Sequence, residues 1–277
     1  MSLSFRAKQT VPAALLRRCL DVALAAAAEA GQAVLPHFRA GVRVENKAGG
    51  GAYDPVTEAD RFAETVIRDH LRSAFPGHGL YGEEHGYESG NELTWVIDPI
   101  DGTRGFMTGM VHWGILIALF DGESPVLGVV HQPFTDEFFY GTNDRADYRR
   151  GAVERRLKVR TCERLEVAVL ASTGPQYFAD GSEQRAFGAL SDAVRLTRYG
   201  GDCYHYCMLA MGQLDLAVEA GLKPYDVQAI MPIVRGAGGI VTTWDAGNAS
   251  LGGRIVAAGD ARIHRAAMDL LESAIGT

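Results

Sequence analysis

The chain has 277 residues, of which 47% are apolar and 22% are charged. This composition is that of an ordinary globular protein and excludes a disordered chain, and the length allows one large domain or two closely packed ones. The net charge of −7 argues against a surface for nucleic acid or for an anionic membrane, because such partners require clustered Lys and Arg. An acidic protein that handles phosphate would need metal ions to do so.

The N-terminal part of the chain predicts helices followed by strands. An amphipathic pattern runs from about residue 12 to 39, and Asp21 and Glu29 interrupt its apolar run, so we expect neither an export signal nor a membrane span. Residues 57–75 predict a second helix. Residues 113–141 then predict a block of antiparallel strands separated by turn residues.

After residue 165, strands and helices alternate, with helices expected near 182–193 and from about residues 202, 226 and 260. Such alternation favours α/β layering. We therefore expect helices that sandwich two sheets, the first largely antiparallel and the second mixed. Because the pattern changes near residue 160, we divide the chain into an N-terminal α+β half, residues 1–160, and a C-terminal α/β half, residues 161–277.

The four cysteines are too few and too scattered for a disulfide framework. They are Cys19, Cys162, Cys203 and Cys207. Cys203 and Cys207 flank His205, but no second Cys/His pair completes a zinc set. We expect buried core thiols in a protein of the reducing cytoplasm.

Carboxylates stand at strand ends or helix starts, beside glycine or proline, in four stretches. These stretches are DPVTEAD (54–60), GEE (82–84), DPIDGT (98–103) and PYD (224–226). Pro99 lacks an N–H group, so we expect the strand to end at Asp98 and the chain to turn, which lets Asp98 and Asp101 converge. Any one of these acidic residues is as easily a helix N-cap or a turn residue, and only their occurrence together favours a site.

Two neighbouring carboxylates repel each other unless a cation compensates them. Mg²⁺ is the natural cation, since it binds carboxylate oxygens and keeps waters while substrate phosphate completes its shell. Gly102 lets the backbone approach a ligand closely, and a short helix opening after it would offer free N–H groups to a phosphate. The stretch therefore predicts a metal site and a phosphate site side by side.

In order and spacing, the stretches DPVTEAD, GEE, WVIDPIDGT, EAGLKPYD and GAGG resemble the inositol monophosphatase superfamily of magnesium-dependent, lithium-sensitive phosphatases. The resemblance covers the chain from about residue 12 to its end. It implies an α/β (α+β) fold, a layered αβαβα sandwich of the inositol-monophosphatase and fructose-bisphosphatase type. It also implies a homodimer that hydrolyses small-molecule phosphate monoesters with two or three Mg²⁺ ions.

The resemblance further implies which residues bind the metal ions. Glu83, Asp98 and the backbone carbonyl of Ile100 would hold one Mg²⁺, and Asp98, Asp101 and Asp226 would hold a second. Glu83 with waters would hold a weaker third ion. Coordination lowers the pKa of water from about 15.7 toward neutrality, so that hydroxide becomes available for attack on the phosphate.

The same resemblance gives roles to residues around the attacking water and the phosphate. Asp60 and Thr103 match the pair that positions and deprotonates the water, and Glu83 is counted with them as a catalytic residue. The amides of Gly102 and Thr103 would receive phosphate oxygens. Lys47 matches a family lysine near the metal site, in a loop whose role varies.

The substrate is predicted from residues beyond the metal ligands. Asp202 and Glu219 would form a carboxylate pair, which suits a substrate with a cationic, N–H-rich body such as the ammonium and imidazole of histidinol phosphate. The stretches RYGGDCYHY and VEAGLKPYDVQAIMPIVRGAGG resemble the bacterial histidinol-phosphatase branch of the superfamily. Asp202 could instead be only the N-cap of the following helix. Arg235 departs from the family pattern, in which Glu is common at this position.

The sequence thus predicts a cytoplasmic, magnesium-dependent histidinol-phosphate phosphatase of histidine biosynthesis. The motifs specify the reaction but not which phosphate monoester is hydrolysed. The alternatives are therefore a broad-specificity inositol monophosphatase and a 3′-phosphoadenosine 5′-phosphate phosphatase. A non-catalytic protein that kept the fold is a further alternative, although no metal ligand of the family pattern is missing.

Overall fold

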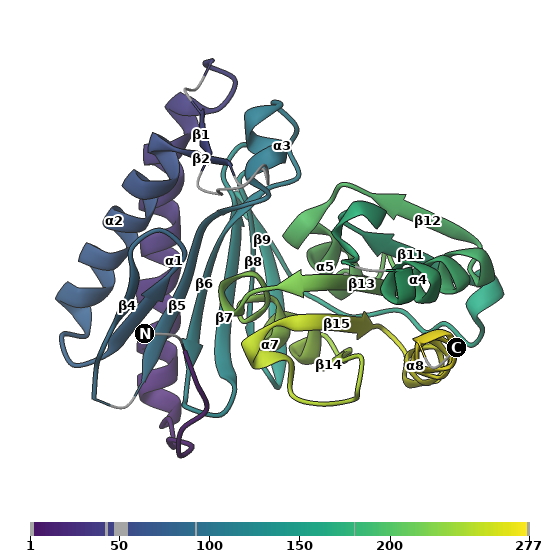
Figure 1. Ribbon diagram of the computed structural model, residues 1–277. Helices are drawn as coiled ribbons and strands as arrows, with labels where there is room; N and C mark the ends of the chain where they lie inside the picture. The colour runs from purple at the N-terminus through teal and green to yellow at the C-terminus, as the bar shows by residue number, and fades with distance from the viewer. Residues whose placement is uncertain (1–2, 42–43, 47–54, 92, 180, 276–277) are drawn as a thin grey trace.

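The computed structural model describes residues 3–41, 44–46, 55–91, 93–179 and 181–275. Its elements form five layers in the order helix, sheet, helix, sheet, helix (Figure 1), which confirms the predicted layered α/β sandwich. Three clusters of buried apolar side chains fill the spaces between the layers. Asp101, Asp202, Glu219 and Asp226, which the sequence singled out as site residues, line one cavity between the two halves.

The first layer consists of α1 (Ala13–Val34) and α2 (Glu58–Ala74), which pack together against one face of the first sheet. Alanines on α1 let the helix approach the sheet closely, and a Cβ added to Gly31 would lie 2.8 Å from the ring of His131. The α-helix ends earlier than predicted, at Val34, and continues as one 3₁₀ turn, because Pro36 cannot donate to the helical ladder.

The stretch Ala13–His37 is long and apolar enough to cross a membrane by length and composition alone. The expectation that Asp21 and Glu29 leave the apolar run too short for a span was thus wrong as to length, but one such helix is weak evidence for a span. The core helix of a globular protein passes the same test, and the buried alanines of α1, among them Ala23, Ala26 and Ala27, lie in the hydrophobic cluster beneath the sheet.

The first sheet has eight strands in the order β10-β9-β8-β7-β6-β5-β3-β4. As predicted, it is largely antiparallel, and only β3 and β5 pair in parallel. The strands are β3 (Gly79–Gly82), β4 (Gly86–Glu88), β5 (Thr94–Asp101), β6 (Gly114–Phe120), β7 (Pro125–Gln132), β8 (Glu137–Thr142), β9 (Arg145–Arg150) and β10 (Val153–Arg156). A separate ribbon pairs β1 (Val44–Asn46) with β2 (Pro55–Thr57), and α3 (Thr103–Met107) follows β5.

Strand β5 does not end at Pro99, so the predicted turn there was wrong. The strand continues to Asp101, and its pairing with β6 shifts register between Asp98 and Asp101. Two residues of β5, Pro99 and Ile100, stand opposite the single Ile115 of β6, which is a β-bulge. A bulge tolerates a proline without an N–H group and breaks the strict alternation of side chains.

The middle layer and the second sheet come from the C-terminal half. Helices α5 (Asp202–Ala210), α6 (Pro224–Val227) and α7 (Ile230–Gly236) contribute to the cluster between the two sheets. The second sheet is mixed, in the order β12-β11-β13-β15-β14. Its strands are β11 (Val169–Ser172), β12 (Leu196–Tyr199), β13 (Leu216–Leu222), β14 (Ile240–Thr243) and β15 (Gly253–Ala258). The last layer is α4 (Gly181–Ala193) with α8 (Ala261–Ile275).

The first sheet ends at Arg156 and the second begins at Val169, on either side of the predicted boundary at residue 160. The two sheets share one cluster of buried side chains, which includes Val96 of the first sheet and Ala217 of the second. The division into two halves therefore describes the order of the elements along the chain, and as a division into domains it stays a prediction.

Candidate active site

Three carboxylates from two elements meet at the end of β5. One oxygen from each of Asp98, Asp101 and Asp226 lies within 4.8 Å of the others. Asp98 and Asp101 flank the β-bulge, and Asp226 belongs to the short helix α6, which follows β13. The bulge thus does what the predicted turn was expected to do, because it brings two side chains of one strand to the same point.

Backbone amides hold each of the three carboxylates in place. The amide of Ile100 donates to Asp98 Oδ1 at 3.1 Å, and the amide of Cys203 donates to Asp101 Oδ2 at 2.7 Å. Asp226 Oδ2 accepts from the amide of Lys223 at 2.7 Å, within a capping box. The side chains are therefore oriented before any ligand binds.

In the part of the chain that the structure describes, the carboxylates of this cluster raise one another's pKa. Burial, together with the nearby Asp226, raises the pKa of Asp101 to about 7. Burial also raises the pKa of Asp226 to about 7 and that of Asp98 well above its ordinary value, with Glu83 as a further contributor to both. A hard divalent cation would remove this repulsion, and a set of converging carboxylate oxygens is the donor set that Mg²⁺ prefers. The residues present fit magnesium.

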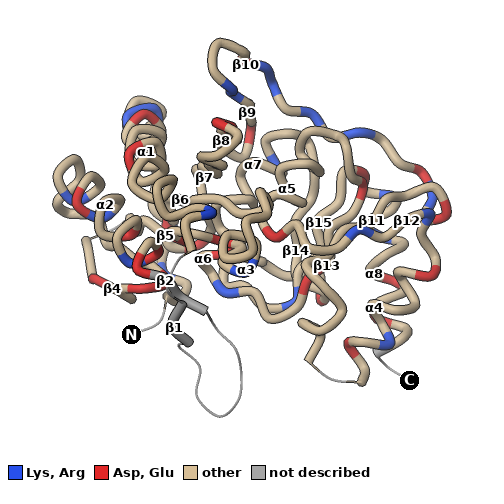
Figure 2. The backbone as a smooth tube through the Cα atoms, turned by 90° about the horizontal axis from the view of Figure 1, so that it is seen from above, with Lys and Arg blue, Asp and Glu red and all other residues tan. Residues whose placement is uncertain are grey.

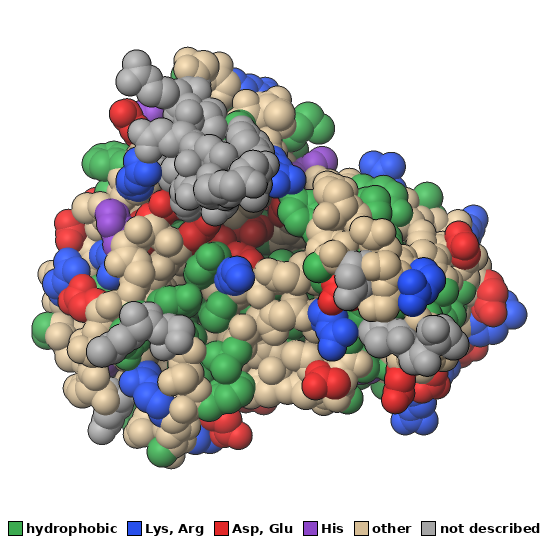
Figure 3. All heavy atoms as spheres, viewed as in Figure 1, with side chains coloured by type: hydrophobic (Ala, Val, Ile, Leu, Met, Phe, Trp, Pro, Cys, Tyr) green, Lys and Arg blue, Asp and Glu red, His purple; other side chains and the backbone are tan. Residues whose placement is uncertain are grey.

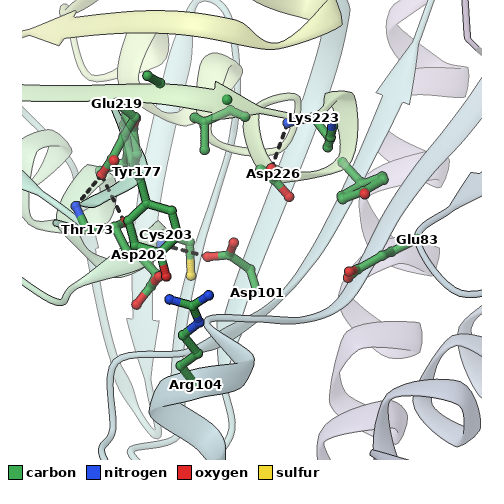
Figure 4. Close-up of a pocket in the computed structure, with 15 residues that line it drawn as sticks. Glu83, Asp101, Arg104, Thr173, Tyr177, Asp202, Cys203, Glu219, Lys223 and Asp226 are labelled. Carbon is green, nitrogen blue, oxygen red and sulfur yellow. Dashed lines mark hydrogen bonds between the residues drawn. The ribbon is translucent and has the colours of Figure 1, made fainter. Parts of the chain in front are cut away.

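Two further predicted residues lie around this cluster. Glu83 stands outside the set of three but lines the same cavity, and its side chain points toward Asp101 and Asp226 (Figure 4). Asp60 is 1% exposed on α2, and its charge contributes to the raised pKa of Asp98. Figure 3 shows the Asp and Glu side chains gathered in the hollow between the two halves. The structure thus brings together carboxylates from α2, β5, α6 and the turn after β3.

Glu64 on α2 is a residue of this region that the sequence analysis missed. It is fully buried and accepts from the amides of Glu84 at 2.6 Å and His85 at 3.2 Å, which follow Glu83 directly. Arg68, one helical turn further on, donates to Glu64 Oε1 at 2.7 Å and also donates to the carbonyl of Gly86. The pair fixes the turn that carries Glu83.

The segment after Asp101 has the conformation that the phosphate-site prediction needs. Gly102 has φ +86° and precedes the first residue of α3, Thr103. A Cβ on Gly102 would lie 2.6 Å from the carbonyl oxygen of His112, so glycine is required here for space as well as for its backbone angle. Thr103 Oγ1 donates to the carbonyl of Ile100 at 3.1 Å, which ties the start of the helix back to the bulge.

A cavity of about 390 Å³ extends from the carboxylate cluster into the C-terminal half. Asp202 and Glu219 both line it, as Figure 4 shows. Asp202 is the first residue of α5, the N-cap position is Gly201, and no side chain caps this helix end. The alternative in which Asp202 serves only as the N-cap is therefore contradicted. Burial, together with the nearby Asp101, raises the pKa of Asp202 to about 7.

Glu219 is 2% exposed and is held by three donors from the end of β11. The amide and the hydroxyl of Thr173 donate to Oε1 at 2.6 and 3.0 Å, and the hydroxyl of Ser172 donates to Oε2 at 3.4 Å. Burial raises the pKa of Glu219 to about 8, against the lowering effect of these hydrogen bonds. The carboxyl group is thus fixed in one orientation at the wall of the cavity.

Arg104 and Tyr177 are among the cavity residues that were not predicted from the sequence. The Arg104 guanidinium of α3 lies over the ring of Tyr177, 5.0 Å from its centroid, across the gap between the two halves. Arg104 also lowers the pKa of Asp202. The sequence around Arg104 does not predict this contact, because Tyr177 is more than seventy residues further along the chain.

Lys47 and Asp54 lie outside the described residues. Cys19, Cys162, Cys203 and Cys207 are all buried free thiols, as expected. Arg235 lies in the last turn of α7, outside the cavity of the carboxylates.

Known proteins resemble this chain in sequence and in fold. A model of the inositol monophosphatase family matches residues 15–275. The bifunctional phosphatase IMPL2, chloroplastic, of Arabidopsis thaliana is 37% identical over 269 residues, 93% of this chain and 76% of that protein. The histidinol-phosphatase of Chlorobaculum parvum is 35% identical over 222 residues, 79% of this chain and 83% of that protein. The solved structure of an inositol monophosphatase from Zymomonas mobilis has a TM-score of 0.82 at 36% identity, over 92% of this chain and 98% of that one.

Proposed function

The chain belongs to the inositol monophosphatase family of phosphatases, and within it we propose that this enzyme hydrolyses L-histidinol phosphate to L-histidinol and phosphate in histidine biosynthesis. The observation that carries the proposal is the cavity that joins the carboxylate cluster to a second acidic wall. Asp101 and Asp226 line one end of it, and Asp202 and Glu219 line the other. A phosphate ester with a cationic body matches both ends.

We assign Mg²⁺ to the first end. Asp98, Asp101 and Asp226 would hold it, together with Glu83 and the carbonyl of Ile100, as two or three ions. When bound, magnesium supplies positive charge to the phosphate and makes a water acidic enough to attack it. The protein contributes the orientation of the ligands, because its own amides donate to the carboxylates of Asp98, Asp101 and Asp226 and hold them in place.

The residues next to the cluster would act on the water and on the phosphate. Asp60 and Thr103 would position the attacking water, and the Asp60 carboxylate would accept its proton. The amides of Gly102 and Thr103 would donate to phosphate oxygens. Phosphoryl transfer requires mainly positioning and charge compensation, so no residue of the protein has to become phosphorylated.

Asp202 and Glu219 would select the substrate body. The ammonium and imidazole of histidinol phosphate carry several N–H donors that need acceptors once they leave water. Glu219 has one oxygen with only a long 3.4 Å bond from Ser172, so this oxygen can accept from a ligand. Inositol, which is neutral, offers no charge to compensate the two carboxylates.

Steady-state kinetics test the proposal with histidinol phosphate, inositol 1-phosphate and 3′-phosphoadenosine 5′-phosphate at saturating magnesium. We expect kcat/KM to be highest for histidinol phosphate. Replacing Asp202→Asn should raise KM for histidinol phosphate about tenfold, since it removes one charge-assisted contact, and should leave KM for inositol 1-phosphate nearly unchanged. Asp192→Asn, which removes an exposed carboxylate of α4, is the matched control and should change neither value.

Equal kcat/KM for histidinol phosphate and inositol 1-phosphate would instead favour a broad-specificity inositol monophosphatase. The name of the Zymomonas mobilis structure supports this second candidate. A preference for the adenosine substrate would favour the third candidate. We also propose that the enzyme is a homodimer and that it is cytoplasmic. The buried free thiols support the second point, because free thiols suit a reducing compartment.

A further inference from the structure

A second cavity, separate from the active site, lies where the β8–β9 turn, the end of β10 and the end of α7 meet. Its volume is about 520 Å³. Three cations line it, Arg156, Lys158 and Arg235, against the single carboxylate of Asp144. Figure 2 shows the Lys and Arg residues that follow one another along β10 and the segment after it. In a chain with a net charge of −7, this is a local excess of positive charge.

The neighbouring arginines of the β9–β10 hairpin all have partners within the protein. Arg145 pairs with Asp147 at 2.7 Å, and Arg150 donates to the carbonyl of Thr135 at 3.0 Å. Arg149 and Arg155 lie over aromatic rings, 4.5 and 5.0 Å from the ring centroids. Among the residues that the structure describes, no ion pair within 4.0 Å joins a carboxylate to any of the three cations of the cavity. The three cations of the cavity thus differ from the neighbouring arginines, because in the described part of the chain none of the three has a carboxylate partner.

Arg235 is the least exposed of the three. Its guanidinium donates one long bond, 3.4 Å, to the carbonyl of Val241. Burial lowers the pKa of Arg235, and no carboxylate among the described residues offsets this effect, although the group stays charged at neutral pH. A partly buried cation without a carboxylate is costly unless an anion reaches it. The negative end of α7 would account for Arg235 alone, but not for Arg156 and Lys158 on the same cavity.

We propose that this cavity binds a small phosphate-bearing anion outside the active site. The guanidinium groups of Arg156 and Arg235 can each donate two parallel N–H bonds to a phosphate, and the Lys158 ammonium adds a point charge. The cavity is within the size range of small-molecule sites and exceeds what a bare phosphate fills, so the ligand would carry an organic part as well. The site gives Arg235, which departs from the family pattern, a role unrelated to the hydrolysis.

Calorimetric titration of the full chain with inorganic phosphate tests the proposal. The titration is done with a metal chelator, because the acidic active site then has no cation to attract phosphate. We expect wild-type protein to bind, and Arg235→Gln to weaken binding about tenfold or more. Arg156→Gln, at an exposed position where the substitution should not disturb folding, should weaken binding as well. Arg235→Lys keeps the charge but loses the two parallel N–H bonds, so it should lose less affinity than Arg235→Gln.

Arg164→Gln provides the matched control. Arg164 is exposed and lines a different cavity of about 610 Å³, so its loss changes the net charge by the same amount at another place. Its phosphate affinity should equal that of the wild type. Absence of phosphate binding by the wild type, or an equal loss in Arg164→Gln, would overturn the proposal. Unchanged affinity in both Arg235→Gln and Arg156→Gln would overturn it as well.

Discussion

Gly102 is the residue on which the phosphate segment depends most directly. A side chain there meets two obstacles, a backbone angle of φ +86° and the carbonyl of His112 at 2.6 Å. The left-handed angle costs an L-residue about 1–2 kcal/mol, and overpacking adds about 1–3 kcal/mol. We expect Gly102→Ala to lower the free energy of unfolding in urea by about 2–5 kcal/mol, the sum of these two costs. It should also reduce kcat strongly, because the peptide between Asp101 and Thr103 has to move.

Gly151→Ala separates the two causes. Gly151 has φ +54°, but a Cβ there meets nothing within 4 Å. This variant should lose only about 1–2 kcal/mol and keep its activity. If both variants lost the same stability and the same activity, the contact with His112 would have no special effect.

The sequence predicted that Asp98 and Asp101 converge, but for the wrong reason. Proline was taken as the end of the strand, whereas β5 passes through Pro99 and bulges opposite Ile115. A bulge depends on the pairing of two strands, and β6 begins thirteen residues after Asp101 in the chain. The local sequence shows that a proline lacks a backbone N–H group, but it does not predict how the neighbouring strand pairs with it.

At the scale of single elements, α2 shows what sequence reasoning left out. Carboxylates beside glycine or proline were singled out, whereas Glu64 stands within a regular helix and resembles a surface charge of an i, i+4 pair. Its actual partners, the amides of Glu84 and His85, lie twenty and twenty-one residues further along the chain. The helix is correctly predicted, but its contact with the turn after β3 is tertiary.

Replacing Glu64→Gln tests that contact. The change leaves the buried Arg68 without its buried carboxylate partner, which typically costs about 3–5 kcal/mol. We expect a loss of unfolding free energy of that order. We also expect a higher magnesium concentration for half-maximal activity, because Glu83 is no longer held toward the cluster. Urea denaturation and a magnesium titration of phosphate release measure the two effects.

Glu88→Gln is the control for the same arginine. Glu88 lies 3.7 Å from Arg68, but its side chain is 49% exposed, so water replaces it at a cost of about 0–1 kcal/mol. Its magnesium requirement should equal that of the wild type. A Glu64→Gln protein as stable as Glu88→Gln would contradict the role given to the buried pair.

At the scale of the whole molecule, the order of layers was predictable and the closure of the site was not. Alternating patterns indicated two sheets between helices. The hydrogen bond from the amide of Cys203 to Asp101, which joins α5 to β5, could not be predicted, because one hundred and two residues separate its partners. The site therefore combines ligands from both halves, Asp98 and Asp101 from one and Asp226 from the other.

This shared site predicts how stability depends on pH and on magnesium. The pKa of Asp101 and Asp226 rises from an ordinary 3.8 to about 7 in the folded, metal-free protein. Between these values the folded state holds more protons than the unfolded state, so the free energy of unfolding falls as pH increases and levels off above pH of about 7. Magnesium requires the deprotonated carboxylates, so its stabilising effect increases over the same range.

Thermal unfolding at about pH 6 and about pH 8, each with and without saturating magnesium, measures both trends. Without metal, we expect a lower Tm at the higher pH, and the increase in Tm on adding magnesium should be larger there. Asp226→Asn removes one titrating ligand from the C-terminal half, so it should flatten the metal-free dependence and reduce the increase caused by magnesium. An equal magnesium effect at both pH values would mean that the metal ligands are already charged at the lower pH. Asp101 and Asp226, whose pKa burial raises to about 7, would then not be the ligands.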